Sequence, residues 1–370
     1  VELLSKVLAI DYFGALVASL VFPLLLLPQL GLMRSAYLVA ALNIAVAVAI
    51  LFRLKSSKRL LASSIAVAVA LLGMFAGASY FEKAIDAEAY RDPVLVYEQS
   101  PYQKIVVTKY GEDLRLYLNR QLQFSSLDEV RYHETLAASA LTSVKDPRNV
   151  LVLGGGDGLL ARELLKYPSV RRVTVVDIDA KVTDLARNNR LLKEVNKGAL
   201  SDPRVKVVNA DAFRFVDDAK GTYDAVLIDL VDPSNERMAK LYSKQFYRNV
   251  SERLSPKGVM VTQATSSFFS PHAFHIVANT VRAGQSGYAV FPFSHNIPSF
   301  GEWGFVLSTK NPSALLKQPL APGTSYQNKK LLAFMIRTQP PKVPKTEVST
   351  LLEPRIIDAY ESDMRQWRYY

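Results

Sequence analysis

The segment that most constrains the fold is residues 150–160, an apolar run that ends in a cluster of glycines just before a helical pattern begins. An uninterrupted apolar run of this length is typical of a buried parallel strand. The glycines permit a tight turn and let a ligand approach the backbone, where the first N–H groups of the following helix are free. This strand–turn–helix unit predicts a ligand-binding α/β sheet.

The rest of the chain up to about residue 263 repeats the same alternation of strand and helix. The pattern predicts a Rossmann-like, doubly wound parallel sheet of the class I methyltransferase type. Ligands of such sheets bind beyond the carboxyl ends of the strands. The predicted strands are residues 150–153, 173–177, 205–208, 224–228 and 258–263, and the helical stretches lie near 159–166, 181–196 and 240–254.

Carboxylates follow several of these strands, at the edge where a ligand would bind. Asp157 lies among the glycines, where its charge would repel a phosphate, so the turn favours a positively charged ligand such as a sulfonium nucleoside over NAD. Asp177 ends the second strand, where nucleotide-binding sheets place an acid for the ribose hydroxyls, whereas Asp179 fits better as a helix cap. Asp211, followed by Ala212, is explained equally well as a contact to an adenine amine and as a cap.

Asp229 and Asp232 lie three residues apart in the loop after the fourth strand, and Pro233 stiffens that loop. Paired acids at an enclosed site can bind a cationic amine and remove its proton, so that the nitrogen lone pair can attack. A divalent cation is the alternative ligand. We expect no metal site, because the chain has no phosphate-binding turn, no cysteine, and four histidines without metal-ligand spacing. Tyr132 either donates a hydrogen bond into this site or packs in the core.

Three apolar stretches precede the α/β region, and each approaches the roughly 20 residues that cross a bilayer. They predict a multi-pass membrane domain, with Pro23 and Pro28 kinking the first stretch. The chain begins with Val1, and we expect that the three helices can be part of a larger bundle. The basic link of Arg53, Lys55, Lys58 and Arg59 favours a cytoplasmic position for that link. The stretches are residues 8–32, 35–52 and 60–79.

These patterns predict four parts: a transmembrane domain, a connector with a small antiparallel β-sheet, a Rossmann-like domain and a C-terminal surface extension with a docked final helix. The net charge of +11 favours contact with anionic lipid, because the basic residues are not interleaved with aromatics as in nucleic-acid binding. Asp128 is a predicted helix N-cap. The parts are residues 1–82, 83–127, 128–310 and 311–370, with small-sheet strands at 94–97, 105–108 and 114–118.

An ordered set of motifs between about residues 94 and 310 resembles the spermidine synthase (aminopropyltransferase) family. Several motifs in the correct order are more specific evidence than any single motif. The apolar N-terminal stretches resemble a bacterial subgroup with a multi-span domain. The motifs are Tyr102-Gln103-Lys104-Ile105, Leu122-Gln123-Phe124, Asp128-Glu129, Tyr132-His133-Glu134, Gly154-Gly155-Gly156-Asp157-Gly158, Arg162-Glu163, Val176-Asp177-Ile178-Asp179 and Asp229 to Pro233.

The resemblance implies transfer of an aminopropyl group from decarboxylated S-adenosylmethionine to a polyamine such as putrescine, leaving methylthioadenosine. It implies no prosthetic group. Asp157 would hold the propylamine of the donor, Asp177 the ribose and Asp211 the adenine. Asp229 would be the base, assisted by Tyr132, with Asp232 beside it. The remaining donor-site residues would be Gln103, His133, Gly154, Gly156, Ile178 and Ala212.

The chain departs from the family pattern mainly on the acceptor side. Leu159 stands at a usual glycine, Leu230 and Val231 replace two serines, and Phe300 replaces a tyrosine. Gln263 and Glu302 are the remaining candidates for binding the amine, with Glu302 a substitute acid for its distal nitrogen.

Two other functions remain open: a methyltransferase that uses intact S-adenosylmethionine, and a membrane sensor that binds a nucleoside or polyamine without turnover. We expect a multi-pass protein of the inner (plasma) membrane. Its catalytic domain is expected in the cytoplasm, where both substrates are made. The positive charge of the 53–59 link favours the opposite orientation, because it places the link itself in the cytoplasm. The family implies a homodimer or homotetramer.

Overall fold

The computed structural model describes residues 2–54, 57–338 and 347–367. The chain divides into two compact units, Val1–Tyr110 and Gly111–Tyr370. This division falls inside the predicted small β-sheet region and not at its ends. Lys55, in the predicted basic link, and residues 339–346 of the predicted extension are outside the described residues.

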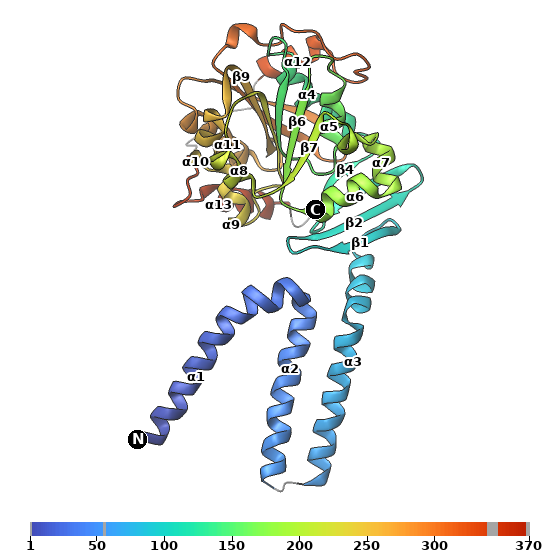
Figure 1. Cartoon of the computed structure of the whole chain (residues 1–370), viewed down its shortest axis with the longest axis vertical. Coiled ribbons are helices and arrows are strands. Elements are labelled where there is room, and N and C mark those ends of the chain that lie inside the picture. Colours follow the sequence, from blue (N-terminus) through green and yellow to red (C-terminus); the bar gives the residue numbers. More distant parts are fainter. Residues whose placement is uncertain (1, 55–56, 339–346, 368–370) are drawn as a thin grey trace. The chain divides into compact units, whose positions relative to one another are not determined.

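The first unit begins with three helical segments that are long and apolar enough to cross a membrane: Leu4–Leu26, Gln29–Arg53 and Lys58–Ala78. Pro23 lies in a short π-helical turn, and Gly31 has a non-helical φ of 75°. The kink expected within the first stretch therefore separates the first two spans, which meet a few residues earlier than predicted. The elements are α1 (Glu2–Val21), η1 (Phe22–Leu26), α2 (Leu27–Arg53) and α3 (Lys58–Glu88), and Figure 1 shows α2 and α3 as an antiparallel pair.

Short antiparallel strands follow the helices, as the sequence predicts. In the first unit β1 (Val94–Gln99) pairs with β2 (Lys104–Tyr110). In the second unit β3 (Asp113–Leu118) pairs with β4 (Gln121–Ser125), a strand that was not among the predicted ones.

The second unit is built on a seven-stranded sheet in the order β10-β11-β9-β8-β5-β6-β7. The five predicted strands pair in parallel, which confirms the expected sheet. The last two strands make the sheet mixed, because β11 runs antiparallel to both of its neighbours. The strands are β5 (Asn149–Gly154), β6 (Arg172–Asp177), β7 (Val205–Asn209), β8 (Tyr223–Asp229), β9 (Leu254–Ser266), β10 (Ala289–Ile297) and β11 (Gly301–Thr309).

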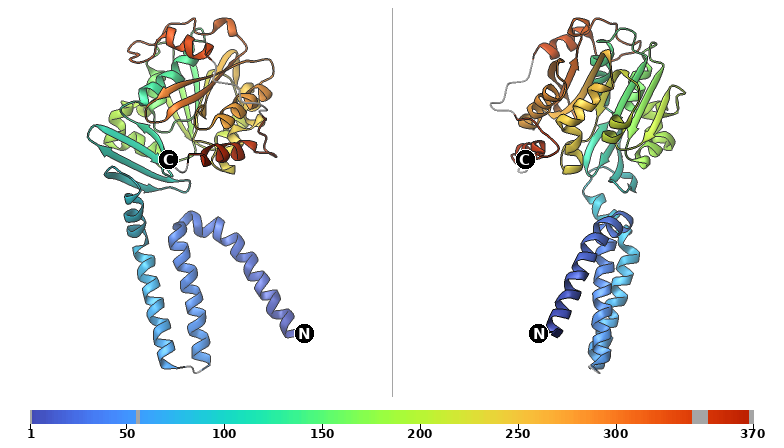
Figure 2. Two further views of the ribbon diagram at one scale, coloured as in Figure 1. Left: turned by 180° about the vertical axis from the view of Figure 1, so that it is seen from behind. Right: turned by 60° about the vertical axis from the view of Figure 1, so that its left-hand side comes forward.

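Helices cover both faces of this sheet (Figure 1 and Figure 2). Successive side chains of a strand point to opposite faces. Val150 and Val152 of β5 accordingly pack in one core cluster, with α4 and α5, while Leu151 and Leu153 pack in the other, with α10 and α11. The helices are α4 (Glu129–Leu141), α5 (Leu159–Leu165), α6 (Ala180–Asn188), α7 (Arg190–Asn196), η2 (Ala199–Ser201), α8 (Ala212–Asp218), α9 (Glu236–Ala239), η3 (Lys240–Tyr242), α10 (Lys244–Glu252), α11 (Pro271–Gly284), η4 (Pro312–Ala314), α12 (Lys329–Arg337) and α13 (Arg355–Arg365).

The helix expected over residues 181–196 is two helices. Asn189 has an extended backbone (ψ of 126°), and its side chain accepts hydrogen bonds from the N–H groups of Leu191 and Leu192. An asparagine in this role ends α6 and caps α7 at the same residue.

The C-terminal part is more deeply packed than the predicted surface extension. Leu332, Met335 and Ile336 of α12 are buried in the core. The Glu134 carboxylate accepts backbone N–H bonds from residues 325–327, which fixes this segment against α4. The expected docking of the final helix is confirmed, because Ile356 of α13 is fully buried in the second core cluster.

Candidate active site

The carboxyl ends of β5 and β8 lie side by side and bring the glycine turn against Asp229. Gly154 pairs with Asp229 in the parallel register, and the N–H of Gly155 donates to the Asp229 carbonyl at 3.1 Å. Gly154 has a φ of 86°, and a Cβ on it would overlap that carbonyl oxygen. Glycine is therefore required here by both conformation and space.

Asp177, at the end of β6, contacts the third glycine of the turn. The Gly156 N–H donates to Asp177 Oδ2 at 3.0 Å, and the Asp179 N–H donates to Oδ1 at 2.8 Å. A Cβ on Gly156 would lie 2.5 Å from Oδ2. Burial raises the pKa of Asp177 to about 6, despite these N–H donors. Ile178 follows with an exposed apolar side chain.

Asp179 and Asp211 are both helix caps. Asp179 accepts from the Lys181 N–H, in agreement with the predicted role. Asp211 accepts from the N–H groups of Phe213 and Arg214 and also pairs with the Lys240 ammonium, which helps to lower the pKa of Asp211 against the effect of burial. A contact from Asp211 or Ala212 to adenine remains a prediction.

Asp157 is enclosed within the turn. Its Oδ1 accepts the Leu159 N–H at 2.9 Å, and its carbonyl accepts from the Asn196 amide at 2.9 Å. Burial raises the pKa of Asp157 to about 6, and the negative charge of Asp229 adds to this, while His133 opposes it. The Asp157 carboxylate is thus held at a place where a cation would stabilise it.

Tyr132, on α4, is joined to Asp229, as the sequence predicted for a hydrogen bond into this site. The Tyr132 hydroxyl donates to Asp229 Oδ1 at 2.6 Å. Burial raises the pKa of Asp229, while His133 and the Tyr132 hydroxyl act in the opposite direction. The Tyr132 ring packs edge-on against Phe300, so Tyr132 both donates this hydrogen bond and packs in the core, and its assistance to a base remains a prediction.

His133 belongs to a chain of buried charged side chains. Arg162 makes two hydrogen bonds to the Glu129 carboxylate, at 2.8 and 2.9 Å, and Glu129 Oε2 accepts from His133 Nδ1 at 2.8 Å. Burial alone would lower the pKa of His133, but Glu129, together with Asp157 and Asp229, raises it to about 9. His133 is therefore an imidazolium at neutral pH and faces two carboxylates.

Side chains from other elements hold the loop after β8 through hydrogen bonds to its main-chain carbonyl groups. Gln263 donates to the Leu230 carbonyl at 2.6 Å, and the Tyr242 hydroxyl donates to the Val231 carbonyl at 2.9 Å. The loop therefore keeps its shape without the two serines of the family pattern. The Gln263 amide N–H group supports the loop in this way, and a direct contact between Gln263 and a substrate remains a prediction.

Asp232 lies in this loop and reaches the C-terminal helix. The Tyr360 hydroxyl of α13 donates to Asp232 Oδ2 at 2.9 Å. The Asp232 carboxyl is also buried, and burial raises its pKa to about 6.

Two further predicted residues hydrogen-bond to serines. Gln103 lies in the turn between β1 and β2, where its N–H donates to Ser100 Oγ at 3.0 Å. Glu302 lies on β11 and accepts from Ser294 Oγ at 2.6 Å. Their roles in binding remain predictions.

Asp128 differs from its predicted role as a cap. It makes no side-chain hydrogen bond to its own helix. Its two carboxylate oxygens instead accept from the N–H and hydroxyl of Ser299, at 2.7 and 2.8 Å. Asp128 thereby fixes the segment that carries Phe300.

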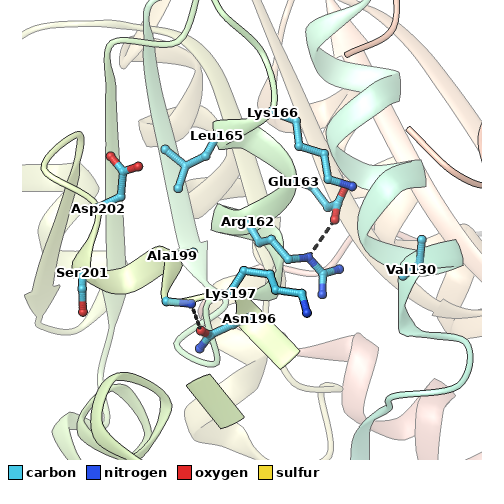
Figure 3. Close-up of a pocket in the computed structure, with 11 residues that line it drawn as sticks. Val130, Arg162, Glu163, Leu165, Lys166, Asn196, Lys197, Ala199, Ser201 and Asp202 are labelled. Carbon is cyan, nitrogen blue, oxygen red and sulfur yellow. Dashed lines mark hydrogen bonds and ion pairs between the residues drawn. The ribbon is translucent and has the colours of Figure 1, made fainter. Parts of the chain in front are cut away.

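A cavity of about 640 Å³ lies beside α5 and α7, and Figure 3 shows the side chains that line it. Arg162 lines it, but none of the predicted site residues does. No group of three His, Cys, Asp or Glu side chains with metal-binding geometry occurs within residues 2–54, 57–338 and 347–367.

Sequence reasoning assigned no role to Arg162, Glu129 or Tyr360. The spacing of Glu129 and His133, four residues apart on one helix face, was an available signal. The contact of Tyr360 with Asp232 spans 128 positions, and no local pattern indicates it.

Comparison with solved structures defines the class of fold. The second unit carries the fold of spermidine synthases: a spermidine synthase in complex with the transition-state analogue AdoDATO aligns with a TM-score of 0.61 at 23% identity, over 66% of this chain and 84% of that chain. The spermidine synthase from Thermotoga maritima aligns with a TM-score of 0.60 at 22% identity, over 74% of this chain and 88% of that chain.

Sequence comparison places the chain in a family. Residues 129–318 match the spermine/spermidine synthase domain. Polyamine aminopropyltransferase of Oceanobacillus iheyensis is 37% identical over 99% of this chain and 72% of that protein. Polyamine aminopropyltransferase 2 of Ralstonia nicotianae is 43% identical over 88% of this chain and 64% of that protein, so the chain spans slightly under two thirds of this relative. The chain belongs to the spermine/spermidine synthase (polyamine aminopropyltransferase) family.

Proposed function

We propose that the chain transfers an aminopropyl group from decarboxylated S-adenosylmethionine to a polyamine such as putrescine, forming a spermidine-type product and methylthioadenosine. The observation that carries this proposal is the enclosure of Asp157 and Asp229 at one sheet edge, where they share the charge of a single imidazolium, His133. Such a site has an excess of negative charge, which suits a donor and an acceptor that are both cations.

The donor is proposed to lie across the glycine turn. Asp177 takes the ribose hydroxyls, and Asp157 takes the propylammonium. Gly154 and Gly156 let the nucleoside approach the backbone, while Ile178 and Ala212 flank the base and Asp211 contacts its amine. His133 and Gln103 complete this side.

The acceptor is proposed to bind on the Asp229 side. An ammonium has no lone pair, so Asp229 removes one proton from the attacking nitrogen. The nitrogen then forms a bond to the propyl carbon next to sulfur, and the C–S electron pair passes to sulfur, giving the neutral thioether. Asp232, Gln263 and Glu302 bind the rest of the amine. Holding nitrogen, carbon and sulfur in line supplies a large part of the rate enhancement.

The charge of Asp157 also separates this proposal from methyl transfer. Intact S-adenosylmethionine carries an α-carboxylate, and its approach to Asp157 would place two negative charges together. Titration calorimetry of the full chain in detergent with the two nucleosides tests this point. We expect tighter binding of the decarboxylated form, and preference for the carboxylated form would overturn the assignment of the donor.

We also propose that the three apolar spans anchor the chain in the inner (plasma) membrane with the α/β unit in the cytoplasm, where both substrates are made. Their exposed apolar side chains support contact with lipid. The chain has no cysteine, so a Lys257→Cys variant provides a single exposed thiol. A membrane-impermeant maleimide should label it in cells only after permeabilisation, and labelling of intact cells would contradict this side.

The oligomeric state is proposed by analogy with the family to be a homodimer or homotetramer. Sedimentation of the full chain in detergent of matched density tests it, and a monomer across the micromolar range would contradict it.

A further inference from the structure

We infer that Tyr360, on the C-terminal helix α13, is a positioning residue for the amine acceptor, which it serves by orienting Asp232. The inference rests on the proposed function, because it needs Asp232 to receive an ammonium group. It extends the site to an element that begins at Arg355, 123 positions after Asp232 (355 − 232 = 123).

The two oxygens of the Asp232 carboxylate have different surroundings. Oδ2 accepts the Tyr360 hydroxyl at 2.9 Å. Oδ1 is shielded from solvent and has no partner of good hydrogen-bond geometry among the described residues, although the Gln263 side chain is close enough to help lower the pKa of Asp232. A shielded carboxylate oxygen without a donor is costly, so an incoming cationic donor would be favoured there. The Tyr360 bond thus settles which oxygen remains for the ligand.

The position of Tyr360 is fixed by the helix that carries it. Ile356, one turn earlier, is fully buried in the core. Asp363, three residues later, accepts the backbone N–H groups of His272 and Ala273 at the start of α11. Beyond the helix, the indole N–H of Trp367 donates to the Phe269 carbonyl at 3.0 Å. Since α13 is held on both sides of Tyr360, the Tyr360 hydroxyl has a fixed position from which it orients the Asp232 carboxylate.

The bond also influences the charge of Asp232. Burial raises the pKa of Asp232 to about 6, and the Tyr360 hydroxyl, with a further contribution from the Gln263 side chain, opposes this rise. Tyr242 and Tyr360 are themselves phenols whose pKa burial raises, so both stay neutral donors near pH 7. Removing the Tyr360 hydroxyl would leave Asp232 more often protonated and less able to bind an ammonium.

The test is Tyr360→Phe in the full chain in detergent, with steady-state kinetics in which each substrate is varied separately. We expect the KM for the amine to rise about tenfold, as for loss of one hydrogen bond to a charged group. The KM for the donor should stay within about twofold, because donor residues keep all their bonds. The acidic limb of kcat/KM for the amine should move to higher pH.

Tyr288→Phe is the matched control. The Tyr288 hydroxyl donates to the Ser251 carbonyl and not to Asp232 or another proposed site residue, so both KM values should remain those of the wild type. In an Asp232→Asn background, adding Tyr360→Phe should change the amine KM no further.

The outcomes separate the two proposals. If the wild-type chain turns over an amine but Tyr360→Phe keeps the wild-type amine KM and pH profile, the inference is overturned and the proposed function stands. Equal increases in both KM values would indicate a general structural role and would also overturn it. Absence of product from the wild-type chain with every amine would overturn the proposed function itself.

Discussion

The Tyr132 hydroxyl donates a 2.6 Å hydrogen bond to Oδ1 of Asp229, although the two residues lie 97 positions apart. The bond fixes the orientation of the carboxylate and leaves Oδ2 to accept a proton. It also lowers the pKa of Asp229, which burial raises. This pair therefore controls both the geometry and the protonation of the proposed base.

Asp229→Asn should reduce kcat by about 10² to 10⁴, the usual contribution of a general base. Donor affinity should change little, because Asp157 and Asp177 remain. Rapid-quench kinetics and calorimetry on the same preparation measure the two quantities. Asp224→Asn is the matched control: Asp224 lies on the same strand but accepts the N–H groups of Arg148 and Asn149. A comparable fall in kcat for the control would contradict the assignment of Asp229.

Tyr132→Phe should shift the acidic limb of the pH–rate profile to higher pH. Burial already raises the pKa of Asp229, and loss of the hydroxyl removes an opposing contribution. Because the base must be deprotonated, the variant should be most impaired at low pH and should approach the wild type as the pH rises. Tyr167→Phe, in the same core cluster, should leave the profile in place. An unshifted limb in Tyr132→Phe would show that the hydroxyl does not tune Asp229.

Much of the fold follows from local sequence pattern. The apolar run before Gly154 and the acids after each strand predict the parallel sheet and its ligand edge, because buried strands and turn residues have strong local signals. The antiparallel return of β11 and the break of the long helix at Asn189 depend on tertiary packing and a single capping side chain. These were not predicted.

The candidate site divides in the same way. Asp157, Asp177 and Asp229 are indicated by their places at strand ends. The Asp128 bond to Ser299 and the Tyr360 bond to Asp232 join segments 171 and 128 positions apart. Such contacts are set by packing of whole elements, and an aspartate before a helix looks like a cap whether or not it caps.

Asp157→Asn should weaken binding of the decarboxylated donor by about 10- to 100-fold, because a charge-assisted bond to its ammonium is lost. Binding of intact S-adenosylmethionine should weaken less or improve, since repulsion of its carboxylate disappears. In the wild type, donor affinity should fall as the pH drops through about 6, where Asp157 becomes protonated. Calorimetry at several pH values measures both effects, and an unchanged ratio of the two affinities would contradict this role.

Glu129→Gln should lower stability by about 3–5 kcal/mol, because it removes the buried carboxylate that pairs with His133 and shares Arg162 with Glu163. It should also flatten the alkaline part of the stability profile. The folded pKa of His133, about 9, exceeds its ordinary value of 6.5. Its contribution to stability is therefore complete below pH 6.5 and is lost as the pH rises through about 9. Thermal unfolding midpoints between pH 6 and 10 measure this, and equal slopes in wild type and variant would contradict the pairing.

The most direct test of the central claim is product analysis by mass spectrometry after incubation of the purified full chain with decarboxylated S-adenosylmethionine and a panel of amines. We predict methylthioadenosine and an amine enlarged by one aminopropyl group in equal amounts, with both formed about 10²- to 10⁴-fold more slowly by Asp229→Asn. Tight donor binding without either product, or a methylated amine formed from intact S-adenosylmethionine, would contradict it.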